Sequence, residues 1–311
     1  MTSPFRDGLA RVRVPATSAN LGPGYDSFGL ALGLYDNVEA AVTGTGGIRV
    51  QVTGEGAQRV RRDASHLVAK TMATAFGRMD VPVPSFDLSC TNRIPHGRGL
   101  GSSSAAIVSG LVLARALVVD GGERLGDESL MSLASELEGH PDNVAPCFYG
   151  GFTIAWSPSG RADDARALRL EPHPDVAAVV FVPSASLSTR KARGMMPDSV
   201  PHADASFNVS RAGLLVAALT ARPDLLFDAT ADRLHQNYRE PAYAASMALV
   251  HDLRDHRGVA ATISGAGPTV IALTTSDRAA EIADLGGALG TGQVLTPDTT
   301  GATLVPPRSD G

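Results

Sequence analysis

The sequence predicts an α+β protein of two domains. Its 311 residues are enough for two domains with sizeable cores. The expected strands and helices follow one another in mixed order, which favours two α+β layers over a doubly wound parallel sheet. A polar, turn-rich stretch at 157–166 is the candidate boundary. We therefore expect one domain over residues 1–160, a second over 161–305 and a disordered tail over 306–311.

The elements expected in the first domain rest on the spacing of apolar residues. Helical spacing in 66–79 predicts an amphipathic helix, and 103–119 is apolar nearly all round, as a central buried helix would be. Alternation in 10–15 predicts a strand, and Pro141 suits the first turn of a short helix. The remaining elements are a helix at 128–138 and strands at 37–43, 47–53 (after a Gly44–Gly47 turn), 85–91 and 151–156.

The second domain is expected to alternate less regularly. Two short strands, 259–263 and 269–273, flank a second glycine-containing loop, SGAGPT at 264–269, which would join them tightly. The other strands are expected at 176–182 and 302–305, and the helices at 188–196, 206–220, 223–230, 241–256 and 278–289.

Composition excludes several functional classes. Hydrophobic residues make up 43% of the chain, charged residues 19%, and the net charge is −5, which argues against a general nucleic-acid surface. Two cysteines, Cys90 and Cys147, are too few for a disulfide framework or a cysteine-rich metal site. The N-terminus lacks the apolar run of a signal peptide, and the longest apolar stretch, 105–119, is shorter than the ~20 residues of a membrane span. We expect a soluble cytoplasmic protein that binds neither nucleic acid nor membrane.

The segment most informative about function is IPHGRGLGSSS at 94–104, directly before the apolar helix. Its three alternate glycines, Gly97, Gly99 and Gly101, let a backbone approach an anion closely. The serines at 102–104 can cap the helix and leave hydroxyls for a phosphate or a metal, and the helix start adds free N–H groups and a positive dipole end. A flexible turn before a buried helix is the alternative. The combination of glycines, serines and helix favours polyphosphate binding.

Lysine usage excludes the commonest phosphate loop. Only Lys70 and Lys191 are lysines among 27 basic residues. A Walker-type loop needs a lysine after its last glycine, and Lys70 has no glycine loop upstream. Phosphates must therefore be held by backbone amides, hydroxyls, a metal ion or arginine.

Three segments together resemble the GHMP kinases: PATSANLGPGYDSFGLAL at 15–32, IPHGRGLGSSSAA at 94–106 and SGAGPT at 264–269. Their order and spacing match that family across nearly the whole chain. The resemblance is strongest to the members that phosphorylate L-homoserine, which EGHPDNVAP at 138–146 and STRKAR at 188–193 also resemble, and a galactokinase-type GEH signature is absent. The loop is often IPLGAGLGSSSA. Here His96 and Arg98 replace Leu and Ala, and Arg98 would either add charge near the phosphates or point to solvent.

The resemblance implies a nucleotide-binding N-terminal domain of the GHMP fold, a ferredoxin-like C-terminal domain and an active site between them. It implies transfer of the ATP γ-phosphoryl group, with Mg²⁺, to the hydroxyl of L-homoserine, giving O-phospho-L-homoserine, the precursor of threonine. Ser103 and Glu136 would complete the Mg²⁺ site, with Glu138 as the rival. The nucleotide-binding residues would be Ile94, Pro95, His96, Gly97, Arg98, Gly99, Leu100, Gly101, Ser102, Ser103 and Ser104.

The resemblance also implies the catalytic groups. Asn143 would lie at the acceptor hydroxyl, whereas Asp142 stays open as a base, since a loose, metaphosphate-like transition state does not require one. Simple capping of the helix that starts at Pro141 is the alternative for both. Glu136 would act with them through the metal, and His140 would be a wall of the pocket.

The residues expected to bind the substrate are those whose charges complement the carboxylate and the ammonium of homoserine. Arg193 and Arg239 match the family positions for its carboxylate, which suits an arginine fork. Asp26 can pair with the ammonium, with Asn20 as a nearby hydrogen-bonding group, although turn chemistry explains both equally well. Thr189 would either cap the helix of Arg193 or line the site. Gly265, in SGAGPT, completes the implied set because the family places that loop against the phosphate loop and the substrate.

Two other functions stay open at this stage. One is another GHMP small-molecule kinase, such as a mevalonate-pathway enzyme, and Asp26 is the residue that best discriminates against it. The other is a non-catalytic nucleotide-binding paralogue, against which the retained serines, Glu136 and Asn143 argue. The sequence leaves a homodimer open and says nothing about feedback inhibition by threonine.

Overall fold

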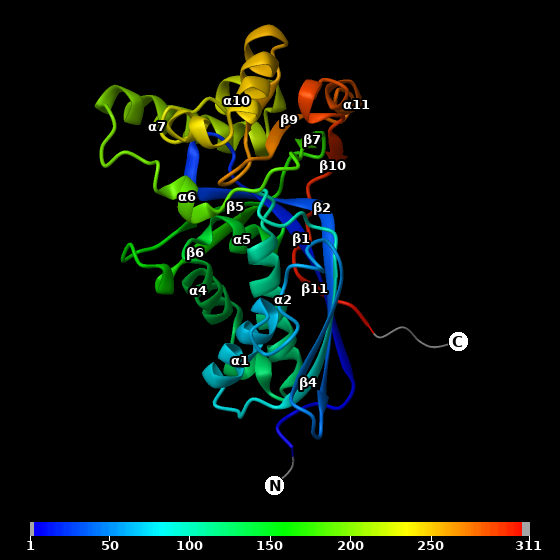
Figure 1. Cartoon of the computed structure of the whole chain (residues 1–311). Coiled ribbons are helices and arrows are strands. Elements are labelled where there is room, and N and C mark those ends of the chain that lie inside the picture. The colour runs from blue at the N-terminus through cyan, green and yellow to red at the C-terminus, as the bar shows by residue number, and fades with distance from the viewer. Residues whose placement is uncertain (1–2, 307–311) are drawn as a thin grey trace.

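The chain folds into two sheets with helices packed on them (Figure 1). The structure is a computed structural model that describes residues 3–306. Within these residues one sheet has seven strands and the other four. The larger sheet and the first five helices form the lower part of the molecule in Figure 1, and the smaller sheet lies above it. This α+β arrangement is the predicted fold class.

The larger sheet is built on one long antiparallel pair, β1 (Leu9–Asn20) and β2 (Gly24–Thr43). β4 (Ser85–Asn92) pairs with β2, and β3 (Ile48–Gly54) is the outer neighbour of β4, parallel to it. The two strands joined by the glycine turn are therefore not partners, because β4 lies between them. The short β11 (Thr303–Leu304) pairs with β1 at the opposite edge.

β1 and β2 are longer than the strands expected at 10–15 and 37–43. The parts that the sequence did not predict, 16–20 of β1 and 24–36 of β2, bury polar and apolar residues alike, so they lack an alternating pattern. Thr17 and Ser18 have no exposed surface. In β2 the run Phe28–Leu32 is apolar or glycine throughout and buried on both sides, so a period-2 pattern is absent. These stretches run under the smaller sheet and carry the chain to the junction of the two parts.

The polar stretch 157–166 does not lead into the second sheet. It connects β5 (Phe152–Trp156) to β6 (Arg166–Leu170), and these two strands pair with each other in the larger sheet, β5 also with β2. The chain enters the second sheet at Val176. Strands β6 and β11, which the sequence assigns to the second domain, therefore both belong to the first sheet.

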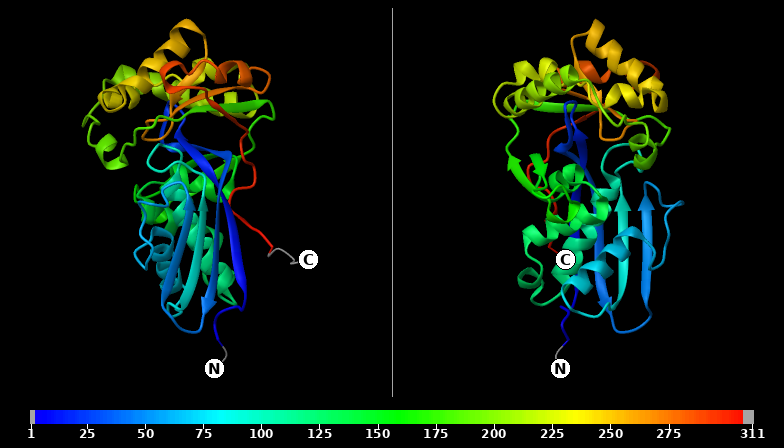
Figure 2. Two further views of the ribbon diagram at one scale, coloured as in Figure 1. Left: turned by 45° about the vertical axis from the view of Figure 1, so that its right-hand side comes forward. Right: turned by 90° about the vertical axis from the view of Figure 1, so that its left-hand side faces the viewer.

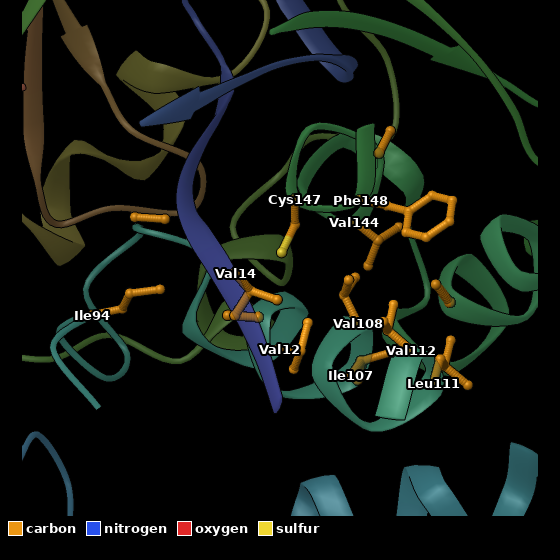
Figure 3. Close-up of a cluster of buried hydrophobic side chains, with 14 of the residues drawn as sticks. Val12, Val14, Ile94, Ile107, Val108, Leu111, Val112, Val144, Cys147 and Phe148 are labelled. Atoms are coloured by element: carbon orange, nitrogen blue, oxygen red, sulfur yellow. The ribbon is translucent and has the colours of Figure 1, made fainter. Parts of the chain in front are cut away.

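Helices cover one face of the larger sheet. They are α1 (Leu67–Arg78), α2 (Ser102–Leu117), the short α3 (Gly121–Arg124), α4 (Asp127–Glu138) and α5 (Pro141–Tyr149). α2 is buried on nearly every side, as its composition predicts. Figure 3 shows its side chains meeting those of α5 and β1: Val108, Val112, Val144, Cys147, Val12 and Val14. This core fixes the N-terminus of α2 and that of α5 relative to β1.

The smaller sheet has the strand order β10–β7–β9–β8 and is antiparallel throughout. Its strands are β7 (Val176–Phe181), β8 (Ala260–Ile263), β9 (Val270–Thr275) and β10 (Gln293–Leu295). Its helices are α6 (Thr189–Arg193), α7 (His202–Thr220), α8 (Leu226–Ala229), α9 (Gln236–Arg239), α10 (Ala244–His251) and α11 (Ala279–Ala283). Figure 2 shows this layer seated across the end of the larger sheet.

Several expected helices are shorter in the structure. The one predicted over 278–289 ends at Ala283, and its remainder holds a single 3₁₀ turn before β10. Two glycines, Gly286 and Gly287, interrupt the helical pattern there. Of the expected tail, residues 307–311 lie outside the described part. Among the described residues, none of the helices is long and apolar enough to span a membrane.

Candidate active site

A cavity lies where the two parts of the molecule meet. Its walls come from the glycine loop, the connection between α4 and α5, the start of β2, the 264–269 loop and two arginines of the second part. The lining residues are Asn20, Asp26, Gly97, Gly99, Gly101, Ser102, Ser103, Glu138, His140, Asp142, Asn143, Leu187, Arg193, Arg239, Gly265, Ala266 and Gly267. Most of the residues predicted from the sequence for substrate, phosphate and chemistry thus come together at one place.

The glycines of the 94–104 loop are required by close approach. Gly97, Gly99 and Gly101 all have positive φ, at 66°, 83° and 71°. A Cβ on Gly99 would lie 2.3 Å from the backbone oxygen of Ser264, and one on Gly101 would lie 1.9 Å from Thr17 Oγ1. Side chains are thereby kept out, and the N–H groups at the start of α2 face the cavity. This is the geometry expected of a loop that binds phosphates.

The serines do not cap α2, contrary to the expectation from sequence. Gly101 occupies the N-cap position in the left-handed conformation, so the serines at 102–104 lie inside the first turn. Ser103 Oγ donates to Glu138 Oε1 at 2.5 Å and Ser104 Oγ donates to the same oxygen at 3.0 Å. The hydroxyls of the loop are thus directed to the end of α4.

Of the two candidate acids on α4, only Glu138 lines the cavity. Glu136 instead accepts a hydrogen bond from Arg78 Nη2 at 2.7 Å, and its side chain is 44% exposed. Glu136, the metal ligand implied by the resemblance, therefore does not line the cavity in this structure, whereas its rival Glu138 does. Residues two apart on a helix point to different faces, so only one of the pair can meet Ser103. Burial raises the pKa of Glu138, and the hydrogen bonds from Ser103 and Ser104 act in the opposite direction.

His140, Asp142 and Asn143 form the wall at the start of α5. His140 is the N-cap residue, and within the described residues no side chain caps this helix, so capping does not account for Asp142 or Asn143. Asp142 is 2% exposed, and its Oδ1 lies 2.5 Å from His140 Nδ1. Burial lowers the pKa of His140, but the hydrogen bond to Asp142 and the charges of Asp142 and Glu138 outweigh it and leave that pKa raised. Asn143 Oδ1 accepts a hydrogen bond from Thr17 Oγ1 at 2.8 Å.

Asp26 and Arg193 are paired with each other. Arg193 Nη1 and Nη2 donate to the two carboxylate oxygens of Asp26 at 2.9 and 2.8 Å, a bidentate pair between the two parts of the molecule. The sequence assigned these residues to opposite ends of a substrate, and the structure shows that they also satisfy one another. Asn20 Oδ1 accepts the N–H of Asp26 and so fixes its backbone, which has φ +56°. Arg193 ends α6; the side chain of Thr189, which begins it, lies outside the described part.

Arg239 reaches the cavity from the other side. It is 2% exposed, and its Nη1 lies 3.5 Å from the carbonyl oxygen of Gly265, which also accepts a hydrogen bond from Asn20 Nδ2 at 2.9 Å. Among residues 3–306 no side chain forms an ion pair with Arg239, and its buried Nε has no hydrogen-bond partner. A buried, uncompensated guanidinium is costly unless an anion binds to it.

Four other residues of the 94–104 loop do not line the junction cavity. Ile94 and Leu100 are core residues. Arg98 Nη2 donates to the carbonyl oxygen of Ser184 at 2.9 Å, so this side chain ties the loop to the second part rather than pointing freely to solvent. His96 lines a separate cavity instead of the junction.

This second cavity, of about 370 Å³, adjoins the first at Ser102 and Ser103. The sequence does not reveal it, because most of its walls come from β2, β4, α2 and residues 59–68, which share no recognisable motif. Its lining is mixed: apolar residues of β2, α1 and α2 lie beside polar ones that include Asp36, Arg59, Arg61, His66 and His96. Burial lowers the pKa of both histidines, which disfavours their charged forms. His66 Nδ1 is buried without a hydrogen-bond partner among the described residues.

Asp36, which lines the second cavity, holds the start of the 94–104 loop by hydrogen bonds. Its side chain is buried, and Oδ1 accepts the N–H groups of Arg93 at 2.6 Å and Ile94 at 2.9 Å. Burial raises its pKa to about 6, against the effect of these two hydrogen bonds. The loop conformation thus depends on a carboxyl group that is costly to ionise.

Comparison with known proteins agrees with this geometry. Two family models match the chain, the GHMP kinases N terminal domain over residues 63–151 and the GHMP kinases C terminal domain over 215–284. The homoserine kinase of Streptomyces coelicolor is 52% identical over 302 residues, covering 97% of this chain and 96% of that protein. The homoserine kinase of Rhodococcus erythropolis is 48% identical over 91% of this chain and 92% of its own length.

Solved structures give the same result. The crystal structure of homoserine kinase from Cytophaga hutchinsonii superposes with a TM-score of 0.81 at 25% identity, covering 98% of this chain and 99% of that one. A putative homoserine kinase from Listeria monocytogenes gives 0.75 at 30% identity, with 96% and 100% covered. The fold is that of the GHMP kinases. Within that class, the chain belongs to the homoserine kinase family.

The buried Asp36 carboxyl leads to a prediction about pH and stability. Its folded pKa of about 6 is above the ordinary 3.8, so the protonated form stabilises the fold, and this contribution is lost as pH rises through 6. The full loss is about 3 kcal/mol, and roughly half of it falls between pH 5 and pH 8. Asp36→Asn keeps an acceptor oxygen for both N–H groups and cannot ionise.

We therefore expect Asp36→Asn to gain about 1.5 kcal/mol of stability relative to the unsubstituted protein when the pH rises from 5 to 8. Urea unfolding of both proteins at the two pH values measures this difference. An identical change in the two proteins would mean that Asp36 ionises without cost.

Proposed function

We propose that this protein catalyses ATP-dependent phosphorylation of the hydroxyl of L-homoserine, which gives O-phospho-L-homoserine for threonine biosynthesis. The observation that carries the proposal is the junction cavity, which has backbone amides at one end and Asp26, Arg193 and Arg239 at the other. Such a cavity suits a phosphate donor facing a small zwitterion. The names and the identities of the relatives support the same reaction.

The 94–104 loop is the proposed binding site for the triphosphate. With two lysines in the whole chain and no Walker loop, the phosphates are left to the amides and the dipole at the start of α2. The second cavity opens beside Ser102 and Ser103 and supplies room for the nucleoside. The apolar part of its lining, such as Val38, Leu67 and Val68, suits the face of a base, and the unpartnered Nδ1 of His66 suits a polar edge of that base.

Ser103 and Glu138 are the groups that fit Mg²⁺. Both offer oxygen, and the hydroxyl and the carboxylate already lie 2.5 Å apart. Residues 3–306 contain no cluster of three or more histidine, cysteine or acidic side chains able to cage a metal ion. A cation held by one carboxylate, phosphates and water is the usual state of Mg²⁺ in phosphoryl-transfer sites. When bound, the ion would neutralise charge on the transferring phosphoryl group.

The opposite end of the cavity matches homoserine in charge. Asp26 is the proposed partner of the ammonium, and Arg193 and Arg239 are the proposed partners of the carboxylate. Asp26 and Arg193 exchange their bond to each other for bonds to the substrate, so both remain paired throughout. Arg239, buried without a carboxylate among the described residues, gains its first anionic partner. Gly265 and Asn20 connect the two sides of this pocket.

In the proposed reaction the substrate hydroxyl oxygen forms the new bond to the γ-phosphorus, while the bond from that phosphorus to ADP breaks and the hydroxyl proton leaves. Asn143 orients the hydroxyl, since its amide lines the cavity and is itself fixed by Thr17. Asp142 is bonded to His140, which favours a positioning role in the wall over that of a free base. Orientation is the larger contribution in a loose transition state.

Parallel measurement of ADP release with homoserine, mevalonate and shikimate tests the proposed function. We expect turnover with homoserine alone, and phosphorus NMR should show the product as a phosphate monoester. Turnover with mevalonate instead would move the chain to another GHMP activity, and no turnover with any of the three would leave a nucleotide-binding protein.

Matched substitutions of the two glutamates of α4 test which of them binds the metal. We predict that Glu138→Gln lowers kcat by 100-fold or more, on the order of 3 kcal/mol, because a neutral amide replaces the one acidic ligand. Glu136→Gln, on the same helix, should change kcat less than twofold, since Glu136 contacts Arg78 at the surface. Titration with Mg²⁺ at saturating ATP and homoserine measures both. The opposite ranking would restore Glu136 as the ligand.

Arg193 should be needed as an arginine and not only as a charge. Its fork makes two parallel bonds to a carboxylate, as it does with Asp26. Arg193→Lys should therefore raise the KM for homoserine 10- to 100-fold, corresponding to ~1.5–3 kcal/mol, and leave the KM for ATP unchanged. Arg190→Lys, at an exposed position of α6, is the control. An altered ATP KM with an unchanged homoserine KM would assign Arg193 to the nucleotide.

A further inference from the structure

Tyr25 precedes Asp26 in β2 and does not itself line the junction cavity. Its ring contacts two side chains of the second part of the molecule. It stacks on His235, with centroids 5.1 Å apart and planes at 26°. The guanidinium carbon of Arg239 lies over the ring, 5.1 Å from its centroid. Tyr25 thus meets the proposed carboxylate-binding arginine with the face of its ring.

The imidazole on which Tyr25 stacks is held rigidly. His235 is fully buried and donates from Nε2 to the carbonyl oxygen of Gly22 at 2.7 Å. Asp232 accepts the N–H groups of residues 234–236, which fixes the turn that carries His235 into α9. The tyrosine ring therefore has a fixed stacking partner, which restricts its own orientation.

Hydrogen bonds hold the Arg239 guanidinium only weakly. Its hydrogen bond to Gly265 is long, at 3.5 Å, and its Nε is unsatisfied within the described part of the chain. α9, which ends at Arg239, is only four residues long. The face of an aromatic ring attracts a guanidinium and favours a defined orientation over it. The ring of Tyr25 is therefore a contact that can orient this charge before a carboxylate binds.

We propose that Tyr25 is a positioning residue, which holds the Arg239 guanidinium in the orientation that receives the carboxylate of the substrate. The proposal rests on the proposed function, since it takes that carboxylate to be that of homoserine. It also explains why Tyr25 and Asp26 are adjacent. One residue orients the group for the carboxylate, and the next binds the ammonium, so a single turn at the start of β2 sets the distance between the two charges.

The test compares side chains with and without an aromatic face. We expect Tyr25→Leu to raise the KM for homoserine about tenfold, with kcat and the KM for ATP within twofold of the unsubstituted protein. Tyr25→Phe keeps the ring and loses only the hydroxyl, for which the structure gives no hydrogen bond among the described residues, and should behave as the unsubstituted protein. Tyr25→Met, of similar length without a ring, serves as a second variant if the leucine protein does not fold.

A second substrate separates positioning from a general structural role. In 3-aminobutan-1-ol a methyl group replaces the carboxylate of homoserine. The kcat/KM for this compound should be the same in Tyr25→Leu and in the unsubstituted protein, because Arg239 has nothing to bind. In an Arg239→Gln background, Tyr25→Leu should have no further effect on the homoserine KM.

Three results would overturn the proposal. They are equal losses with both substrates, a Tyr25→Phe protein as impaired as Tyr25→Leu, and additive effects in the double variant. A failure of the unsubstituted protein to phosphorylate homoserine is a different result, since it would contradict the proposed function and not the role of Tyr25 beside Arg239.

Discussion

The site depends on one backbone contact between the two parts of the molecule. The 264–269 loop packs directly on the glycine loop: Ser264 Oγ donates to the carbonyl oxygen of Gly99 at 2.5 Å, and the N–H of Thr269 donates to that of Arg98 at 3.1 Å. The N–H of Gly265 donates in turn to Ala19 at the end of β1. Only a residue without a Cβ at position 99 permits this approach. The contact sets the proposed phosphate end and the proposed amino-acid end of the cavity at a fixed distance from each other.

Charge is distributed between these ends in a way that favours transfer between two bound molecules. The proposed phosphate end relies on amides, one helix N-terminus and Glu138, and it lacks the lysine of a Walker loop. The proposed amino-acid end holds a charged pair, Asp26 with Arg193, and the buried Arg239. Charged groups that are already oriented need little rearrangement when ligands bind. The second part of the molecule contributes both arginines, so neither part alone holds a complete site.

Much of the fold could be predicted from the sequence, because most helices and short strands have clear periodicity. The unpredicted parts of β1 and β2 are buried on both sides at the junction, where alternation disappears. At the site, the resemblance favoured Glu136 over Glu138 as the metal ligand, and only the direction of each side chain on α4 shows that Glu138 is the one that lines the cavity. The Asp26–Arg193 pair joins residues that are 167 positions apart, and most of the second cavity has no motif, so neither could be found without the folded chain.

The contact between the two loops is tested most directly at Gly99. Gly99→Ala adds a Cβ 2.3 Å from the backbone oxygen of Ser264, in a left-handed conformation, which should separate the loops. We expect kcat/KM to fall about tenfold or more for ATP and for homoserine alike, while circular dichroism shows an intact fold. Gly122→Ala, where the added Cβ meets open space, is the control and should match the unsubstituted protein. Unchanged kinetics in Gly99→Ala, or a loss confined to ATP, would contradict the claim that this contact holds both ends of the site together.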